Sequence, residues 1–463
     1  MIATIFKFEW KQFVRSKGLL SALIIFTAIG LFCLQQGSAV YDFQQVAIDS
    51  ALVKKQRSYE KVKLVFDTLK PLAEGMHELQ TPFSLERRLQ DVVAREISPL
   101  TVLSIGQSDV YAPLLSGHFR GSIFNNQFAE FQNPEKLLAG NLDVSFFLLF
   151  LFPLLFIALA YNARSADVEA GITPLLRTQA GAVDRIVQYR VLFRWIIALV
   201  PVLIVLLASA VQLSNATNFS AAVWLQWWAV ALLYAFFWLL VVLLLQRFRL
   251  NSVIHVMTLS GIWVLLLIAI PGLLNTWLNY RYPAANKTEV AEFRDFDSKA
   301  WDLPFEQHQA FLLKHYPAYK NLVFKDMADS LKFRSFGYAL QVLDQEQSLY
   351  KKASADRQQR SRAEEQLFWI NPVGGVLRSF ASISSTSLHH QQSFENAVLS
   401  YREQKLKYLF EKLVAGTPFL KAEFEQMPRY KPVSANGSVL HYLLPIFLLS
   451  AILLGGALMK RNS

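Results

Sequence analysis

Apolar residues along this chain gather in six long, largely uncharged runs, separated by polar segments of very different lengths. A helix rises ~1.5 Å per residue, so such runs are typical of helices that cross a ~30 Å hydrocarbon layer. The pattern therefore predicts an all-α polytopic membrane protein with six transmembrane helices. The predicted spans lie at residues 18–34, 143–161, 191–212, 222–245, 253–274 and 438–458.

The segment before the first span, residues 1–17, has helical period. Ile5 and Phe13 share one face and Lys7 lies opposite. This pattern is typical of a cytoplasmic interfacial helix that lies in the plane of the membrane, although a charged flank to the first span explains it equally well. The small residues at 37–39 leave a cleaved signal peptide as a less favoured alternative.

Two polar segments, residues 35–142 and 279–437, are long enough to bury apolar cores of their own. Helical period recurs within them at residues 53–72, 341–366 and 394–413, whereas strand-like alternation is weak. The pattern predicts two mainly helical outer domains with irregular connections.

Basic residues mark one side of the predicted bundle. Near the span ends on that side they are Lys7, Lys11, Arg15, Lys17, Arg164, Arg177, Arg185, Arg190, Arg194, Arg247, Arg249, Lys460 and Arg461. The short loop on the opposite side, residues 213–220, has none. Because Lys and Arg in short loops stay in the cytoplasm, both termini are predicted to be cytoplasmic and the two long polar segments extracytoplasmic.

Composition narrows the choice of partners. The chain has 463 residues, of which 53% are hydrophobic and 17% charged, and its net charge is +11. The basic residues lie in mixed-charge loops or at span ends, so the predicted partner is the lipid bilayer and not nucleic acid. The single cysteine, Cys33, lies in the first apolar run and permits no disulfide within the chain.

The sequence carries none of the common catalytic or metal-binding motifs. It has no Gly-x-x-x-x-Gly-Lys-Ser/Thr and no Gly-Lys pair, so the chain is not its own P-loop ATPase. It also lacks His-Glu-x-x-His, Gly-x-Ser-x-Gly and paired-cysteine motifs. His308, His315, His389 and His390 are better interpreted as surface or packing residues, because adjacent helical side chains point ~100° apart. We therefore predict no catalytic residue, metal or cofactor in this chain.

The spans themselves contain almost no ionisable side chain. Carriers that couple transport to protons or sodium usually need such groups in mid-membrane. The sequence therefore disfavours an ion-coupled carrier and fits helices that move under force applied from outside the bilayer.

The polar loop at residues 162–190 is the strongest candidate for a functional contact. Asp167 and Glu169 lie near its start, where acidic side chains suit a helix N-terminus. Leu175 and Leu176 follow and could insert into a partner. A simple connecting turn is the alternative interpretation.

Two groups of residues carry a family resemblance. The first is Asn133-Pro134, Gly140, Asp143, Phe146, Pro153-Leu154-Leu155, Glu169-Ala170-Gly171-Ile172-Thr173 and Leu175-Leu176. The second is Trp369-Ile370-Asn371-Pro372, Ser384-Ser385-Thr386-Ser387, Phe394 and Tyr401-Arg402. They resemble ABC-2 type permeases, in particular the bacterial branch with large outer, periplasmic domains after the first and fifth spans. The chain departs from that family at Ile172 and Pro174, where a direct Gly-Thr-Leu is more usual.

The resemblance implies the permease half of an ABC transporter with a type V exporter-like fold. It would work as a homodimer or heterodimer in the bacterial inner, cytoplasmic membrane. Separate cytoplasmic ABC ATPase subunits would hold the ATP and Mg. The loop between spans two and three would be the coupling helix, which sits in a groove of the ATPase. Its residues here would be Asp167, Glu169, Gly171, Thr173, Leu175, Leu176 and Arg177.

Several functions fit these expectations. The first is export or mobilisation of an envelope component, lipid, polysaccharide or peptide. A second is mechanotransmission, in which ATP-driven motion acts on a periplasmic partner without moving cargo. A third is a non-transporting sensor or scaffold whose outer domains bind a ligand. An intramembrane enzyme is least favoured, because the spans offer no nucleophile or acid–base pair.

Overall fold

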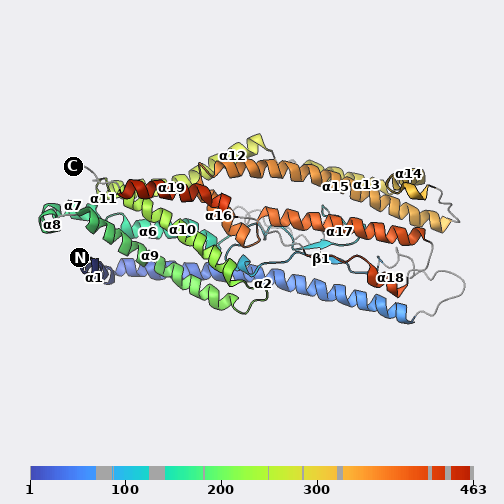
Figure 1. The fold of residues 1–463 in the computed structure, drawn as a ribbon, viewed down its shortest axis with the longest axis horizontal. Coiled ribbons are helices and arrows are strands. Elements are labelled where there is room, and N and C mark those ends of the chain that lie inside the picture. Colours follow the sequence, from blue (N-terminus) through green and yellow to red (C-terminus); the bar gives the residue numbers. More distant parts are fainter. Residues whose placement is uncertain are drawn as a thin grey trace.

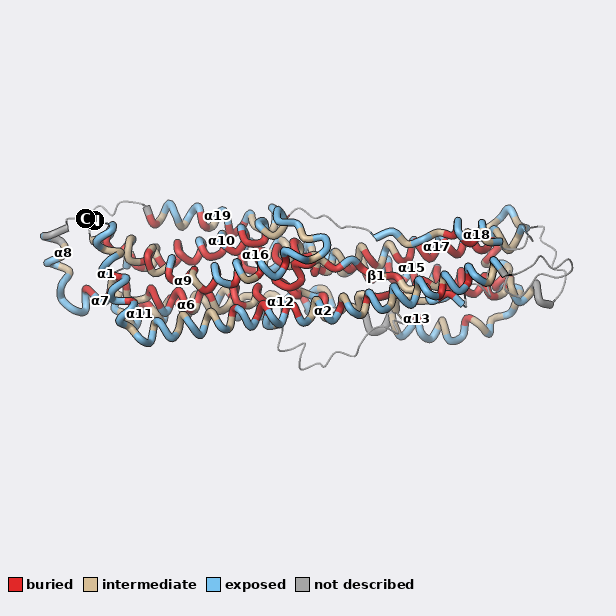
Figure 2. The backbone as a smooth tube through the Cα atoms, turned by 90° about the horizontal axis from the view of Figure 1, so that it is seen from below, coloured by how far each residue is buried: buried red, intermediate tan, exposed pale blue. Residues whose placement is uncertain are grey.

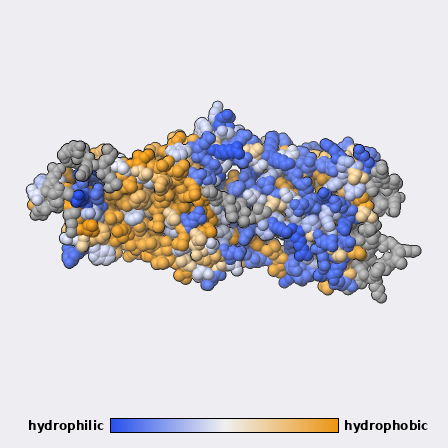
Figure 3. Space-filling view, in the orientation of Figure 1, coloured by the Kyte–Doolittle hydropathy of each residue, from blue (hydrophilic) through white to orange (hydrophobic). Residues whose placement is uncertain are grey.

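Helices run lengthwise through an elongated molecule, with a hydrophobic half and a hydrophilic half (Figures 1 and 3). The structure is a computed structural model. It describes residues 2–68, 86, 88–124, 141–180, 183–248, 250–283, 286–320, 327–415, 420–432 and 439–458.

Six of the described helices are long and apolar enough to cross a membrane. They are α2 (Lys17–Thr68), α5 (Val144–Phe146) continued by η3 (Phe147–Leu151) and α6 (Phe152–Ala160), α9 (Val183–Leu213), α10 (Ala221–Leu245), α11 (Ser252–Val264) continued by η4 (Leu265–Ala269) and α12 (Ile270–Arg281), and α19 (Leu440–Leu458). Figure 3 shows their apolar side chains as a continuous belt over one half of the molecule. The prediction of a mainly helical polytopic membrane protein is confirmed at this level.

The first span and the start of the outer part form one helix. We predicted a change of element at residues 34–35, yet α2 continues to Thr68. The chain has no proline before Pro71, so nothing in the covalent structure interrupts the helix where the lipid-facing run ends. Hydropathy marks the edge of the bilayer and not the end of the helix. Gly37 lies at this edge because a Cβ there would come within 1.9 Å of the Val102 carbonyl oxygen.

Other predicted boundaries move for the same reason. The predicted loop at residues 162–190 ends earlier, because α9 begins at Val183 and the third span is the continuation of that helix. The fifth span reaches Arg281, seven residues beyond the predicted end at residue 274.

Two membrane helices contain a π-helical turn directly before a proline. η3 ends two residues before Pro153, and η4 ends two residues before Pro271. Proline lacks the N–H that would bond the carbonyl four residues back, and its ring clashes with that carbonyl, so a wider turn lets the helix continue. Pro271 therefore does not interrupt the fifth span.

Side chains from neighbouring helices bond the carbonyls around the first of these prolines. The Leu149 carbonyl, four residues before Pro153, accepts a hydrogen bond of 2.8 Å from the Tyr234 hydroxyl on α10. The adjacent Phe150 carbonyl accepts one of 3.0 Å from Trp263 Nε1 on α11. In hydrocarbon a backbone polar group without a partner costs several kcal/mol, so these contacts join η3 of the second span to α10 and α11.

The remaining elements divide between the two halves. The hydrophilic half holds β1 (Val92–Ala94), β2 (Leu114–Ser116), α13 (Asn286–Ala300), α14 (Phe305–His315), η5 (Pro317–Tyr319), α15 (Met327–Leu367), α17 (Leu388–Val414) and α18 (Lys421–Gln426). η2 (Pro99–Val102) and α16 (Pro372–Ile383) pack into the apolar core of the membrane helices. β1 and β2 pair antiparallel, with Val93 opposite Leu115. The outer end of α2 lies beside them (Figure 1).

The two predicted outer domains pack into one domain. A single apolar cluster contains Val62 and Phe119 from the first polar segment together with Phe336 and Leu409 from the second. Phe119 and Phe336 stack with their ring centroids 5.4 Å apart. Each segment therefore completes the core of the other, and burial is larger than either could achieve alone.

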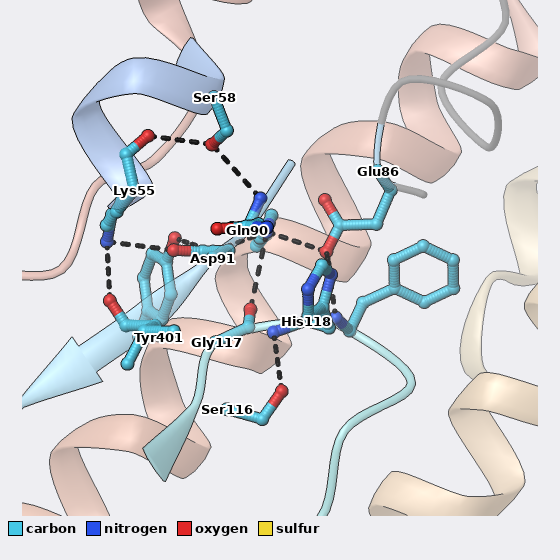
Figure 4. A network of polar contacts seen from close by, with 12 residues as sticks. Lys55, Ser58, Glu86, Gln90, Asp91, Ser116, Gly117, His118 and Tyr401 are labelled. Atoms are coloured by element: carbon cyan, nitrogen blue, oxygen red, sulfur yellow. Dashed lines mark hydrogen bonds and ion pairs between the residues drawn. The ribbon is translucent and has the colours of Figure 1, made fainter. Parts of the chain in front are cut away.

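Fully buried ion pairs cross the same interface (Figure 4). Lys405 Nζ lies 2.6 Å from Asp91 Oδ2 and 2.7 Å from Glu86 Oε1. Figure 4 shows Asp91 and Glu86 with Lys55 and Tyr401 nearby. Asp91 also pairs with Lys55 of α2 at 2.8 Å, and the Tyr401 hydroxyl donates to it at 2.6 Å. Burial raises the pKa of the Asp91 carboxyl, but the ammonium groups of Lys405 and Lys55 outweigh that effect and hold the pKa well below its usual range.

Lys405→Met should destabilise the outer domain in a pH-dependent way. In the wild type Asp91 has a depressed pKa, so its contribution is present above the unfolded pKa and is lost as pH falls through the folded one. Without Lys405, burial raises the pKa of Asp91 and Glu86, and the buried charges cost roughly 3 kcal/mol or more near pH 7. We expect that deficit to shrink near about pH 4.5, where these carboxyls take up protons.

The measurement is the thermal unfolding midpoint of wild type and variant at both pH values. Lys63→Met is the matched control, because its pair with Glu425 is exposed and exposed pairs contribute little. An equal deficit of Lys405→Met at both pH values would contradict the assigned charges.

Candidate functional site

A bent pair of short helices protrudes from the end of the molecule opposite the outer domain (Figures 1 and 2). The pair is α7 (Ser165–Glu169) and α8 (Thr173–Ala180), and α1 (Ile2–Arg15) lies at the same end. The end of α19 is also here, because Arg247 donates a hydrogen bond to the Gly456 carbonyl. The predicted loop therefore forms a compact helical tip.

Gly171 makes the bend between α7 and α8. Its φ is +68°, a conformation that side chains with a Cβ rarely adopt. The space around its Cα is open, so the glycine is needed for the backbone and not for packing. The Ile172 N–H bonds the Asp167 carbonyl at 3.1 Å and closes the turn. The bend points α8 away from the bundle.

Asp167 does not face solvent but anchors the tip to the bundle. Its carboxylate accepts a hydrogen bond of 2.5 Å from Arg190 of α9. The same guanidinium lies 3.2 Å from the Glu9 carboxylate of α1. Glu9 is only 4% exposed, and its other oxygen is 3.0 Å from Nε of Arg194. Two arginines and two carboxylates thus balance their charges in a largely buried cluster that ties α1, α7 and α9 together.

The cluster extends to the end of the second span. Arg194 Nη1 donates to the Leu159 carbonyl at 3.0 Å and to Asn162 Oδ1 at 2.6 Å. Carbonyls at a helix C-terminus have no partner within the helix, and a guanidinium satisfies them while opposing the negative end of the helix dipole. α6 therefore joins the same anchor.

Glu169 holds the tip to a fourth helix. Its carboxylate accepts a hydrogen bond of 2.7 Å from the Ser252 N–H, which is the first residue of α11. Beside it the hydroxyls of Ser165 and Ser252 are 2.7 Å apart. An acidic side chain at a helix N-terminus is stabilised by the dipole and by the free N–H groups. The sequence suggested that Glu169 stabilises a helix N-terminus. It does so in the structure, but the helix is α11 and not a helix of the tip.

Three apolar side chains on the tip are exposed. The exposed fractions are 44% for Val168, 41% for Ile172 and 55% for Leu175. Leu176 and Thr173 are half-buried. We call Val168, Ile172 and Leu175 the tip face. They lie outside the bundle, at the same end as charged α1.

The structure thus divides the predicted site residues by role. Asp167 and Glu169 are anchors, Gly171 sets the bend, and Leu175 belongs to the exposed face. Arg177 lies in α8, but its side chain is outside the described residues.

Sequence reasoning missed the partners of these anchors. Arg190 and Arg194 were interpreted as basic residues at span ends, Glu9 and Val168 were not singled out, and Ile172 was noted only as a departure from the family pattern. A signal for Glu9 was present: with 3.6 residues per turn it lies between Ile5 and Phe13 on the apolar face of α1. A carboxylate in that position indicates a buried cation partner.

The four histidines that were considered as metal ligands lie on two helices, α14 and α17. In the part of the chain that the structure describes, no group of three or more His, Cys, Asp or Glu side chains could hold a metal ion. His308 is buried on α14, and His389 lies on α17. His255 is buried as well, 3.1 Å from the Leu245 carbonyl at the end of α10.

Comparison with known proteins identifies one matching family model. It is described as a domain of unknown function (DUF3526) and matches residues 285–432, which form α13 to α18 and belong to the outer domain. No curated protein and no solved structure matches the chain. The match covers the second polar segment and does not include the tip.

Glu9→Gln should loosen the anchor without touching the tip. Two largely buried guanidinium groups would keep only Asp167 as a charged partner, and removing one member of a buried pair costs on the order of 3 kcal/mol. We expect a clearly lower thermal unfolding midpoint of the purified protein and faster proteolysis at residues 162–182. Asp184→Asn is the control, because its pair with Arg164 leaves Asp184 70% exposed. Equal midpoints for the two variants would contradict the buried cluster.

Proposed function

We propose that this chain is the membrane subunit of an ATP-driven ABC transporter of the ABC-2 type. ATP is hydrolysed by separate cytoplasmic subunits that dock on the tip formed by α7 and α8. The observation that carries the proposal is the exposed tip face of Val168, Ile172 and Leu175, held by buried ion pairs at one end of the membrane helices. The sequence contains no P-loop, so in this proposal the ATP-binding site lies in the partner subunit.

The anchor supports the proposal because it transmits force. Asp167 and Glu169 connect α7 directly to α9 and α11, and Arg190 passes the connection on to α1 through Glu9. When ATP binding closes two ATPase subunits, a push on the tip reaches these helices together, as in a rigid-body transition.

The remaining parts of the proposal follow from the same orientation. The tip and both termini face the cytoplasm of a bacterium, the outer domain faces the periplasm, and the bundle lies in the inner membrane. The working unit is a dimer of this chain or of this chain with a related one. Its cargo is an envelope component, lipid, polysaccharide or peptide, moved by rocking of the helices.

The double substitution Ile172→Asp and Leu175→Asp tests the docking. It places two carboxylates in the apolar contact and leaves every anchor residue in place, so at least about tenfold less ATPase subunit should copurify from native membranes. The captured subunit must carry a P-loop by mass spectrometry and hydrolyse MgATP. Its activity should no longer respond to the chain.

Phe248→Asp is the matched control. Phe248 is 52% exposed and lies in the turn after α10, at the same end of the molecule. It should copurify the ATPase at wild-type level. Retention of the ATPase by the double variant would refute docking at the tip. Capture of no P-loop protein by the wild type would favour a sensor or scaffold instead.

A second function, mechanotransmission, is favoured by α2. This helix has 52 residues and joins the membrane half to the outer domain without a break. A continuous helix passes displacement over its length of roughly 78 Å with little loss. Spin labels are placed at the exposed positions Leu20 and Lys63 of α2, each paired with a label on α17. The distance between the two labels of each pair should change when ATP is added to cargo-free vesicles. Unchanged distances together with cargo accumulation would support transport alone.

A further inference from the structure

A groove in the outer domain is lined by positive charge. It has a volume of about 530 Å³ and lies between the outer part of α2 and the segment that precedes β1. The residues that line it are Lys54, Arg57, Ser58, Lys61, Val62, Val65, Arg88 and Gln90. Of the lining residues that the structure describes, four carry a positive charge and none carries a negative one.

Helical period explains why the charges gather there. Lys54, Arg57 and Lys61 are spaced three and four residues apart, so they share one face of α2. At ~100° per residue, the nearby carboxylates Glu60 and Asp67 point to other sides of the helix. The charged side chains that α2 places on the groove are therefore all basic.

Cations next to the groove differ from those that line it, because each of the neighbours has a carboxylate partner. Lys55 pairs with Asp91, Lys63 with Glu425, and Lys421 with Asp67. Among the described residues, Lys54, Arg57, Lys61 and Arg88 pair with no carboxylate. Four like charges around one groove repel each other, and this cost persists unless a ligand neutralises them.

The floor of the groove is fixed in position. The Ser58 hydroxyl accepts a hydrogen bond of 3.1 Å from the Gln90 N–H and donates one of 2.7 Å to the Lys55 carbonyl. Figure 4 shows Ser58 and Gln90 beside the buried pair of Lys55 and Asp91. This link holds the backbone that carries Arg88 against α2, so the four cationic side chains start from fixed positions around the groove.

We propose that this groove binds a phosphorylated ligand with at least two negative charges. Guanidinium groups bind phosphate through two parallel N–H donors, and lysines add point charges. Arg57 and Arg88 supply the first kind of contact, and Lys54 and Lys61 supply the second. The volume suits a diphosphate or a small phosphorylated sugar. The proposal does not depend on the coupling function.

The position of the groove limits the source of the ligand. Ser58 is 24 residues along α2 from Leu34, the end of the predicted first span. At ~1.5 Å per residue this is roughly 36 Å beyond the bilayer surface. Headgroups of the surrounding membrane do not reach so far. The ligand is either a soluble phosphorylated compound or a lipid phosphate presented by another membrane or carrier.

Titration calorimetry of the full chain with inorganic pyrophosphate tests the first source. The chain is held in phosphatidylcholine nanodiscs. Flotation of the same nanodiscs with vesicles that contain phosphatidic acid, whose phosphomonoester can carry two negative charges, tests the second source. We expect binding to at least one probe, weakened by raised salt because the groove is open to solvent. In Arg57→Gln with Lys61→Gln the affinity should fall by about tenfold or more.

Lys63→Gln with Lys421→Gln is the matched control, with the same change in net charge outside the groove. It should bind as the wild type does, and Arg88→Gln is the second groove variant should the first fail to fold. Binding to neither probe at about 1 mM would overturn the proposal. Equal affinity of wild type and groove variants, or an equal loss in the control, would overturn it too.

Discussion

The guanidinium of Arg190, held between Glu9 and Asp167, is the interaction on which the membrane end of the molecule depends. A charged group this deep among helices is stable only if opposite charges and hydrogen-bond acceptors surround it. With Arg194 it brings α1, α6, α7 and α9 to one point. The tip can be exposed and yet rigid because Asp167, its link to Arg190, is buried. An apolar face held in this way loses little conformational freedom when a partner binds it.

The same principle organises the far end. Lys405 and Arg402, on one face of α17, reach the carboxylates of Asp91 and Glu346. Lys405 thereby bonds the segment that follows the first span. Each buried cation fits only its own carboxylate partner. These pairs therefore select one packing of the two polar segments, whereas apolar contacts alone would allow several. The outer domain is therefore a single unit, and α2 connects it to the membrane helices.

Between the two ends, the bilayer imposes its own condition. Every backbone carbonyl in hydrocarbon needs a donor, and prolines remove donors. The Tyr234 hydroxyl and Trp263 Nε1 supply them around Pro153. Helix-breaking residues thus become points where neighbouring helices are bonded together.

The sequence by itself determined what depends on local composition. The six apolar runs, the helical character of the polar segments and the lack of a P-loop were readable, because hydropathy, periodicity and motifs are properties of neighbouring residues. The anchor partners Glu9 and Arg190 lie 181 positions apart, and Lys405 lies 314 positions from Asp91. Only tertiary structure decided that Asp167 faces inward, that Glu169 bonds the start of α11 at the surface, and that Ile172 and Leu175 face out. Only tertiary structure merged two predicted outer domains into one, because burial is set by what packs across space and not by what precedes in the chain.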